Sequence, residues 1–250
     1  MVISTNEQWL VNYNTTSSAR LCLFCFPYAG GTASVFKDWS RFLPDVEIYA
    51  IQLPGHGARL RESAFVRISP LIENLVPAIL PYLIKPFALF GHSLGALIAF
   101  EVARNLRDNY GISPIHLFVS GRHAPQIKKA SVYDLPNDKF LELLQTYNGT
   151  PKEVLQNSEL MELLLPSIRA DFEISDTYEY VPSSPLNCPI SAYGGLNDPI
   201  ISSTDLKAWK IHTNAAFSLQ MFPGDHFFLN TYRQSLVETI GGELKNSLLK

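Results

Sequence analysis

The chain alternates between short apolar runs and longer stretches in which apolar residues recur every three or four positions. The runs are nearly continuous in their apolar character, which is typical of strands buried on both faces of a sheet. They lie at 21–26, 46–53, 87–90, 115–120, 189–193 and 217–222, and the helical patterns lie at 34–42, 69–83, 94–107, 204–212 and 231–249. This alternation predicts an α/β fold with a mostly parallel central sheet flanked by helices.

One segment, 125–185, interrupts the alternation. It has no apolar run of the strand type, and its apolar residues recur at helical spacing, as at Phe140, Leu143 and Leu144. We interpret it as a helical lid inserted between the fourth and fifth predicted strands, over the carboxyl ends of the strands. The alternative is an additional packing layer. The whole chain, 1–250, is then expected to form a single domain.

The composition fits a folded protein and excludes several kinds of partner. Of the 250 residues, 46% are hydrophobic and 17% are charged, which excludes a disordered chain. The net charge of −3 comes without the basic stripe of a nucleic-acid-binding protein. The N-terminal residues lack the basic and apolar regions of a signal peptide, and no apolar stretch reaches the ~20 residues of a membrane-spanning helix. We therefore expect a cytoplasmic protein that binds neither nucleic acid nor membrane.

The chain has three cysteines, Cys22, Cys25 and Cys188, an odd number that argues against a disulfide framework. The first two form a C-x-x-C, a spacing that redox and metal sites also use. They lie within the predicted strand 21–26, where positions three apart point to opposite faces of the sheet. We therefore expect buried core cysteines and no metal site.

A G-x-S-x-G pattern at 91–95 places Ser93 at its centre. The pentapeptide directly follows the predicted strand 87–90 and directly precedes the helical run 96–107. This is the strand–turn–helix context of a nucleophile elbow, in which the serine stands on a sharp turn at a helix N-terminus. The alternative role for Ser93 is that of an ordinary helix N-cap.

A serine nucleophile needs a base, and the base needs an acid that orients it. In proteins with such an elbow, the acid and then the histidine follow the serine along the chain. His226 lies just after the last predicted strand, and Asp198 lies in the loop after the fifth. The other histidines lie before the serine, inside the elbow, within a strand, ahead of the acid or on a helical run. The other candidate acids fit less well: Asp171, Asp176, Asp205 and Asp225.

The oxyanion of such a reaction needs two backbone N–H donors. One is expected from Leu94, the residue after the nucleophile. The second is expected from the loop after the first predicted strand, 27–31 (PYAGG), whose small residues let the backbone approach the substrate. We select Ala29 as this donor, and the alternative is a glycine turn that only starts a helix.

Several motifs are distributed over nearly the whole chain, from Trp9 onwards. They are 26–31 (FPYAGG), 52–55 (QLPG), 91–95 (GHSLG), 120–125 (SGRHAP), 147–151 (YNGTP), 169–172 (RADF), 193–198 (YGGLND) and 223–227 (PGDHF). Together they resemble the type II thioesterases, the stand-alone editing hydrolases of nonribosomal peptide and polyketide synthesis. The resemblance implies an α/β-hydrolase fold with a helical lid and a catalytic triad of Ser93, Asp198 and His226.

The resemblance further implies hydrolysis of acyl thioesters on phosphopantetheinyl carrier proteins through an acyl-enzyme. An acyl or peptidyl carrier protein is then the partner, and small acyl groups are the substrates. No metal or bound cofactor is expected, because the phosphopantetheine arrives with the substrate. An acyl-coenzyme A thioesterase and a carboxylesterase or lipase are the alternatives, since the triad chemistry is the same. A binding protein that has lost the chemistry is disfavoured by the complete triad. A monomer is the expected state.

Carrier proteins are typically acidic around the attachment serine, so docking on this slightly acidic chain needs local positive charge. Arg59, Arg61, Lys128 and Lys129 follow loops expected on the same side of the sheet as Ser93. They are the candidates for a docking surface, and the alternative is a solvated surface.

Overall fold

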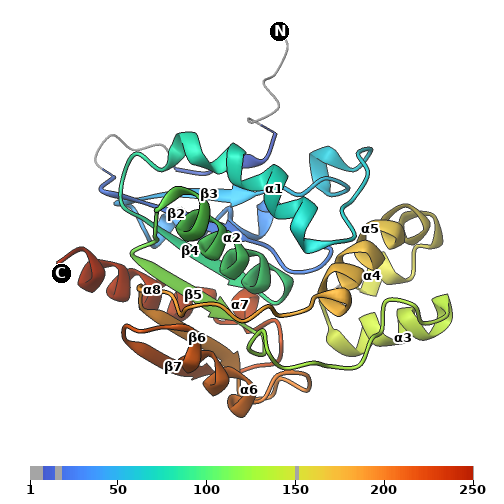
Figure 1. Ribbon diagram of the computed structural model, residues 1–250. Coiled ribbons are helices and arrows are strands. Elements are labelled where there is room, and N and C mark those ends of the chain that lie inside the picture. Colours follow the sequence, from blue (N-terminus) through green and yellow to red (C-terminus); the bar gives the residue numbers. More distant parts are fainter. Residues whose placement is uncertain (1–7, 15–18, 150–151, 250) are drawn as a thin grey trace, which may run out of the picture.

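The computed structural model describes residues 8–14, 19–149 and 152–249 (Figure 1). Seven strands form one sheet in the order β1-β3-β2-β4-β5-β6-β7, and neighbours are parallel except β1 with β3. The strands are β1 (Leu10–Asn12), β2 (Leu21–Phe26), β3 (Val46–Ile51), β4 (Phe87–His92), β5 (His116–Ser120), β6 (Ile190–Gly195) and β7 (Phe217–Phe222). The predicted α/β fold with a mostly parallel central sheet is confirmed.

Helices cover both faces of the sheet, and each face has its own apolar core (Figure 1). One face packs against α1 (Ile68–Ile79), α2 (Leu94–Tyr110) and α6 (Ser203–Lys207). The other packs against α7 (Phe228–Thr231) and α8 (Arg233–Leu248). Because both faces are buried, the strand sequences are apolar throughout rather than alternating.

Strand β2 contributes to both cores at once. Cys22 belongs to the first core, whereas Cys25 belongs to the second, so the two thiols point to opposite faces of the sheet. Together with Cys188 they are free and buried, and burial raises the pKa of Cys22 and Cys188 to about 12. The expectation of buried core cysteines is confirmed.

Two local elements differ from the sequence prediction. Strand β1 is not among the predicted strands, because its three half-buried residues at the edge of the sheet are too few to form a recognisable hydrophobic pattern. The predicted helix 34–42 consists of two 3₁₀ turns, η1 (Ala33–Phe36) and η2 (Trp39–Arg41). Their buried residues Ala33, Phe36 and Trp39 are three positions apart, which is the period of a 3₁₀ helix. Further 3₁₀ turns are η3 (Gly57–Arg59), η4 (Leu80–Tyr82) and η5 (Ala208–His212).

The carboxyl ends of the central strands meet at one edge of the sheet. Phe26 at the end of β2 pairs with Gly91 of β4, and His92 at the end of β4 pairs with Ser120 of β5. The loops that follow these strands are therefore neighbours in space. Ligands of open α/β sheets bind at this edge.

The segment between β5 and β6 carries α3 (Asn137–Tyr147), α4 (Lys152–Leu155) and α5 (Ser158–Thr177), and no strand among its described residues. These helices share a small apolar core of their own, which includes Phe140 and Ile168. Figure 1 places them beyond the carboxyl ends of the parallel strands. Within the part of the chain that the structure describes, none of the helices has the length and apolar character needed to cross a membrane.

Candidate active site

Ser93 stands on the sharp turn between β4 and α2. Its backbone has a φ of +53° and a ψ of −117°, a conformation that residues with side chains rarely adopt. The Ser93 N–H donates to the Ser120 carbonyl over 2.8 Å, which holds the turn. A Cβ at Gly91 would lie 2.1 Å from the Gly95 carbonyl oxygen, and one at Gly95 would lie 2.1 Å from that of Phe26. Glycine is therefore required on both sides of the serine, as in a nucleophile elbow.

His226 and Asp198 form a buried pair at the same edge of the sheet. Nδ1 of His226 lies 2.7 Å from Oδ2 of Asp198, and the side chains are 5% and 0% exposed. The other carboxylate oxygen accepts the N–H groups of Ile200 and Ile201, at 2.8 and 3.1 Å, which fixes the carboxylate in place. Since a carboxylate only accepts hydrogen bonds, Nδ1 carries the proton and Nε2 is left as the basic nitrogen.

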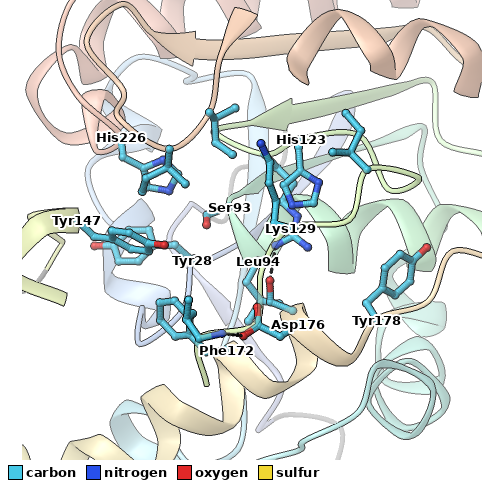
Figure 2. A pocket seen from close by; sticks show the side chains of 18 of the residues that line it. Tyr28, Ser93, Leu94, His123, Lys129, Tyr147, Phe172, Asp176, Tyr178 and His226 are labelled. Atoms are coloured by element: carbon cyan, nitrogen blue, oxygen red, sulfur yellow. Dashed lines mark hydrogen bonds between the residues drawn. The ribbon is translucent and has the colours of Figure 1, made fainter. Parts of the chain in front are cut away.

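The serine and the imidazole line one cavity (Figure 2). Among the described residues, the Ser93 hydroxyl makes no hydrogen bond to His226. Catalytic hydrogen bonds of this kind are often long before the substrate binds. The structure thus brings the three predicted triad residues to one place, with the histidine already oriented by the acid.

His92 supports the His226 ring from the side, although sequence analysis gives it no role. The two ring centroids are 5.1 Å apart, and Nδ1 of His92 is hydrogen-bonded to Ser120 Oγ at 2.9 Å. Complete burial, together with the nearby His226, lowers the pKa of His92 well below its usual value, so this ring stays neutral. The residue lies inside the G-x-S-x-G pattern, which was the available signal.

Both expected oxyanion donors reach the cavity. Leu94 is the first residue of α2, and its N–H has no partner within the helix. Ala29 lies in a turn closed by a 2.8 Å hydrogen bond from the Gly31 N–H to the Tyr28 carbonyl. Ala29 and Leu94 both line the cavity with Ser93. The positive end of the α2 dipole adds to the stabilisation of an oxyanion there.

The cavity has a volume of about 320 Å³, and both the sheet edge and the segment between β5 and β6 contribute to its lining. Ligand pockets typically begin at about this size. Ser93 lies between two sides of the cavity that differ in their chemical character (Figure 2). One side is aromatic and the other is polar: Tyr28, Tyr147 and Phe172 against His123, Lys129 and Tyr178. These lining residues could not be predicted, because most come from the segment between β5 and β6 and from loops without a local pattern.

The other acidic candidates are engaged elsewhere. Asp225 binds the Phe227 N–H and the Asn148 amide, Asp205 caps α6, Asp176 binds the N–H groups of Val132 and Tyr133, and Asp171 contacts His56. None of these four carboxylates contacts the His226 ring in the described part of the chain. The structure therefore favours Asp198 as the acid.

The structure contradicts the expectation that Arg59 belongs to a docking surface. Arg59 is 8% exposed, its guanidinium lies 4.4 Å from the Trp9 ring centroid, and it donates to Glu62 and to the Gln52 carbonyl. The contact with Trp9 joins segments fifty positions apart in the sequence, so no local pattern reveals the burial of Arg59. Lys128 is exposed beside Glu179, at 3.8 Å, and remains a candidate.

Comparison with known proteins agrees with this geometry. Residues 22–244 match the family model of the thioesterase domain. Gramicidin S biosynthesis protein GrsT from Aneurinibacillus migulanus is 45% identical over 97% of this chain and 96% of its own length. Thioesterase PikA5 from Streptomyces venezuelae is 36% identical over 94% of this chain and 85% of its own.

Comparison with a solved structure also identifies the fold as that of a thioesterase. The type II thioesterase BorB from the borrelidin biosynthetic cluster superimposes with a TM-score of 0.86 and 36% identity, covering 94% of this chain and 97% of its own. The resemblance to type II thioesterases is confirmed, and so is the α/β-hydrolase fold that it implies. The chain therefore belongs to the thioesterase family and is a hydrolase of thioesters.

Proposed function

We propose that the protein removes acyl groups from the phosphopantetheine arm of acyl or peptidyl carrier proteins in nonribosomal peptide or polyketide synthesis, through an acyl-enzyme on Ser93. The observation that carries the proposal is the pairing of His226 with Asp198, 2.7 Å apart, at the cavity that Ser93 lines. A serine, an oriented histidine and nearby backbone N–H donors are the machinery of acyl transfer. The relatives that serve such pathways support the substrate class.

In the acylation step, Nε2 of His226 accepts the proton of Ser93 Oγ while the oxygen attacks the thioester carbonyl carbon. The oxyanion that forms accepts hydrogen bonds from the N–H groups of Ala29 and Leu94. The carbon–sulfur bond then breaks, and the leaving thiolate takes the proton from His226. Asp198 keeps the proton on Nδ1 and stabilises the imidazolium while it exists.

Deacylation uses the same groups with water as the nucleophile. His226 accepts a proton from the water, whose oxygen attacks the ester carbonyl on Ser93. The tetrahedral intermediate collapses, the proton returns to Ser93 Oγ, and the carboxylic acid leaves. We propose no metal or bound cofactor, because the phosphopantetheine is part of the substrate. A cytoplasmic monomer remains the proposed form.

The two sides of the cavity support this choice of substrate. The aromatic side, with Tyr147 and Phe172 from the lid, suits an acyl chain, since apolar surface is buried there. The polar side, with His123 and Lys129, suits the amides and phosphate of the pantetheine arm. Ser93 between them is placed to meet the thioester.

Mass spectrometry of intact acyl-carrier proteins tests the proposal. Carrier proteins loaded with acyl groups of different length are incubated with the enzyme, and the loss of acyl mass is followed in time. We expect hydrolysis by the native protein and none above background by Ser93→Ala. The matched acyl-coenzyme A and an oxyester of the same acid are assayed in parallel. Faster turnover of either one than of the acyl-carrier protein would reject the proposed donor and favour the corresponding alternative enzyme.

A further inference from the structure

A second buried histidine–aspartate contact lies beside the site, and the proposed reaction does not use it. His56 follows β3, and Asp171 lies on lid helix α5. Nε2 of His56 is 2.9 Å from Oδ2 of Asp171, and the side chains are 4% and 3% exposed. The contact is an ion pair whose direction departs from that of a hydrogen bond. Charges this deeply buried persist only when they are paired, and pairing alone does not explain why they are there.

The same carboxylate oxygen also holds the backbone of the loop after β2. The Gly30 N–H donates to Oδ2 of Asp171 over 2.7 Å. Gly30 is the third residue of the turn from Tyr28 to Gly31, and its φ of +75° is the value that a type II turn needs at that position. The second residue of this turn is Ala29, the proposed oxyanion donor. Asp171 therefore fixes the peptide group adjacent to that donor.

Helix α5 contacts the turn at a second point. Ile168 lies three positions before Asp171 and so on the same face of the helix. A Cβ added to Gly30 would lie 3.1 Å from Ile168 Cγ1, which shows how closely the helix lies against the turn. Ile168 and Phe172 also line the cavity. One helix therefore contacts both the space for the substrate and the turn that carries Ala29.

His56 supplies the counter-charge for Asp171. Its Nδ1 lies 2.9 Å from the Pro54 carbonyl oxygen, and its Nε2 faces the carboxylate. The Pro54 carbonyl only accepts hydrogen bonds, so Nδ1 carries a proton, and the carboxylate beside Nε2 favours a second proton there through its negative charge. Burial alone lowers the pKa of His56, but the adjacent Asp171 outweighs it and raises the pKa above its ordinary value. The positive charge of His56 attracts the Asp171 carboxylate, and a hydrogen bond from an N–H group to a carboxylate is stronger than one between neutral groups.

We propose that Asp171 is a positioning residue for the oxyanion hole. From the lid helix, and with His56 as its counter-ion, it holds the turn 28–31 so that the Ala29 N–H faces the developing oxyanion. The hole is then complete only while α5 is seated against the turn, which couples lid position to transition-state stabilisation. This inference rests on the proposed function, because it assumes an acyl transfer at Ser93.

Three variants test the role in graded steps. Asp171→Ala removes the acceptor, and we expect a loss of about 100-fold in kcat, the lower end of what one lost oxyanion donor costs. Asp171→Asn keeps an oxygen for the Gly30 N–H but no charge, and about tenfold is expected. His56→Gln removes the counter-ion and leaves the acceptor, so its loss should not exceed that of Asp171→Asn. If Asp171→Ala does not fold, the two milder variants carry the test.

Two inhibitors separate positioning from a general structural role. An alkyl boronic acid forms a tetrahedral adduct with Ser93 and places an oxygen in the oxyanion hole. A pantetheine thioether with CH₂ in place of the carbonyl fills the same cavity without using the hole. We expect the boronate affinity to fall in parallel with kcat, while the thioether affinity changes less than about twofold. Equal losses for both probes, or no loss for the boronate, would overturn the inference.

The matched control is Glu173→Gln on the same helix. Glu173 pairs with Arg67 near the start of α1 and has no contact with the turn or the cavity in the described part of the chain. The variant removes an ion pair between α5 and the core but leaves Gly30 held. It should keep native kcat and boronate affinity. Losses equal to those of Asp171→Asn would mean that any anchor of α5 suffices, which also overturns the specific role of Asp171.

Failure of the proposed function is visible without these variants. In that case the native protein would not bind the boronate more tightly than Ser93→Ala does, or would not hydrolyse acyl-carrier protein. Failure of the present inference leaves both native results intact and appears only in the Asp171 and His56 variants.

Discussion

Two buried histidine–aspartate pairs lie near the substrate cavity, and they differ in what the second ring nitrogen faces. In the His226–Asp198 pair the nitrogen and oxygen are 2.7 Å apart, and in the His56–Asp171 pair they are 2.9 Å apart. His226 lines the same cavity as Ser93, and its contact with Asp198 uses Nδ1 and not Nε2. His56 has an acceptor at both nitrogens, the Pro54 carbonyl and the carboxylate.

The difference teaches that residue identity and burial do not make a histidine a base. A base needs a ring nitrogen without a proton at the place where one must be taken up. The contact with one acceptor leaves such a nitrogen on His226, whereas the Pro54 carbonyl and the Asp171 carboxylate on either side of His56 favour its protonated form. Their aspartates differ in the same way, because Asp198 orients a ring and Asp171 holds a backbone turn.

The largest expected effect on kcat comes from substituting each of the two histidines separately. His226→Ala should lower kcat by up to about 10⁶-fold, as Ser93→Ala should, because members of a triad act as one unit. His56→Gln should lose at most about tenfold, since Ser93 and His226 keep their arrangement. Acyl-carrier hydrolysis followed by intact mass measures both. A loss in His56→Gln as large as that in His226→Ala would abolish the distinction between base and counter-ion.

The next largest effect on kcat is expected from substituting the two aspartates. Asp198→Asn should lose on the order of 10⁴ in kcat, because the amide donates to Nδ1 and leaves the proton on Nε2, where it cannot serve as a base. Asp171→Asn should lose about tenfold, because the Gly30 N–H keeps an acceptor. Single-turnover acylation of Ser93, followed by quenched mass spectrometry, compares them directly. Near-native acylation by Asp198→Asn would move the acid role to another residue.

The sequence predicts the first pair and not the second, for a physical reason. Ser93, His226 and Asp198 each follow a predicted strand, and parallel strands bring their carboxyl ends together, so local patterns suffice to place them. Gly30 and Asp171 are 141 positions apart in the chain, and the motif 169–172 that contains Asp171 does not show which backbone group its carboxylate contacts. Only the packing of α5 against the sheet edge makes the contact.

The same limit explains what else sequence analysis predicted or missed. The strands and the opposite faces of Cys22 and Cys25 follow from a period of two along one short segment. The burial of Arg59 depends on its contact with Trp9, which directly precedes the edge strand β1. The lining of the cavity depends on how the lid packs, which no local period encodes.

The smallest expected effect is a pH dependence of stability that isolates the contribution of His56. The pKa of His56 is raised in the folded state, so its contribution is fully present below the unfolded value of about 6.5 and is lost as the pH rises through the folded value. Burial lowers the pKa of His123 and His212 to about 4, so these residues lower stability as the pH falls below about 6.5. The two kinds of contribution therefore occupy different pH windows and have opposite slopes.

Thermal unfolding of the native protein and His56→Gln from pH 5 to 9 isolates the His56 contribution. The difference in Tm between them should be largest at the acid end and should shrink as the pH rises above about 6.5, because only the native protein loses a charged partner of Asp171 there. His123→Gln serves as the comparison: burial lowers the pKa of His123 to about 4, so removing this histidine should raise the Tm relative to the native protein as the pH falls below about 6.5. If the His56→Gln difference stays constant or grows with pH, His56 is not the cation paired with Asp171, and its role as counter-ion is wrong.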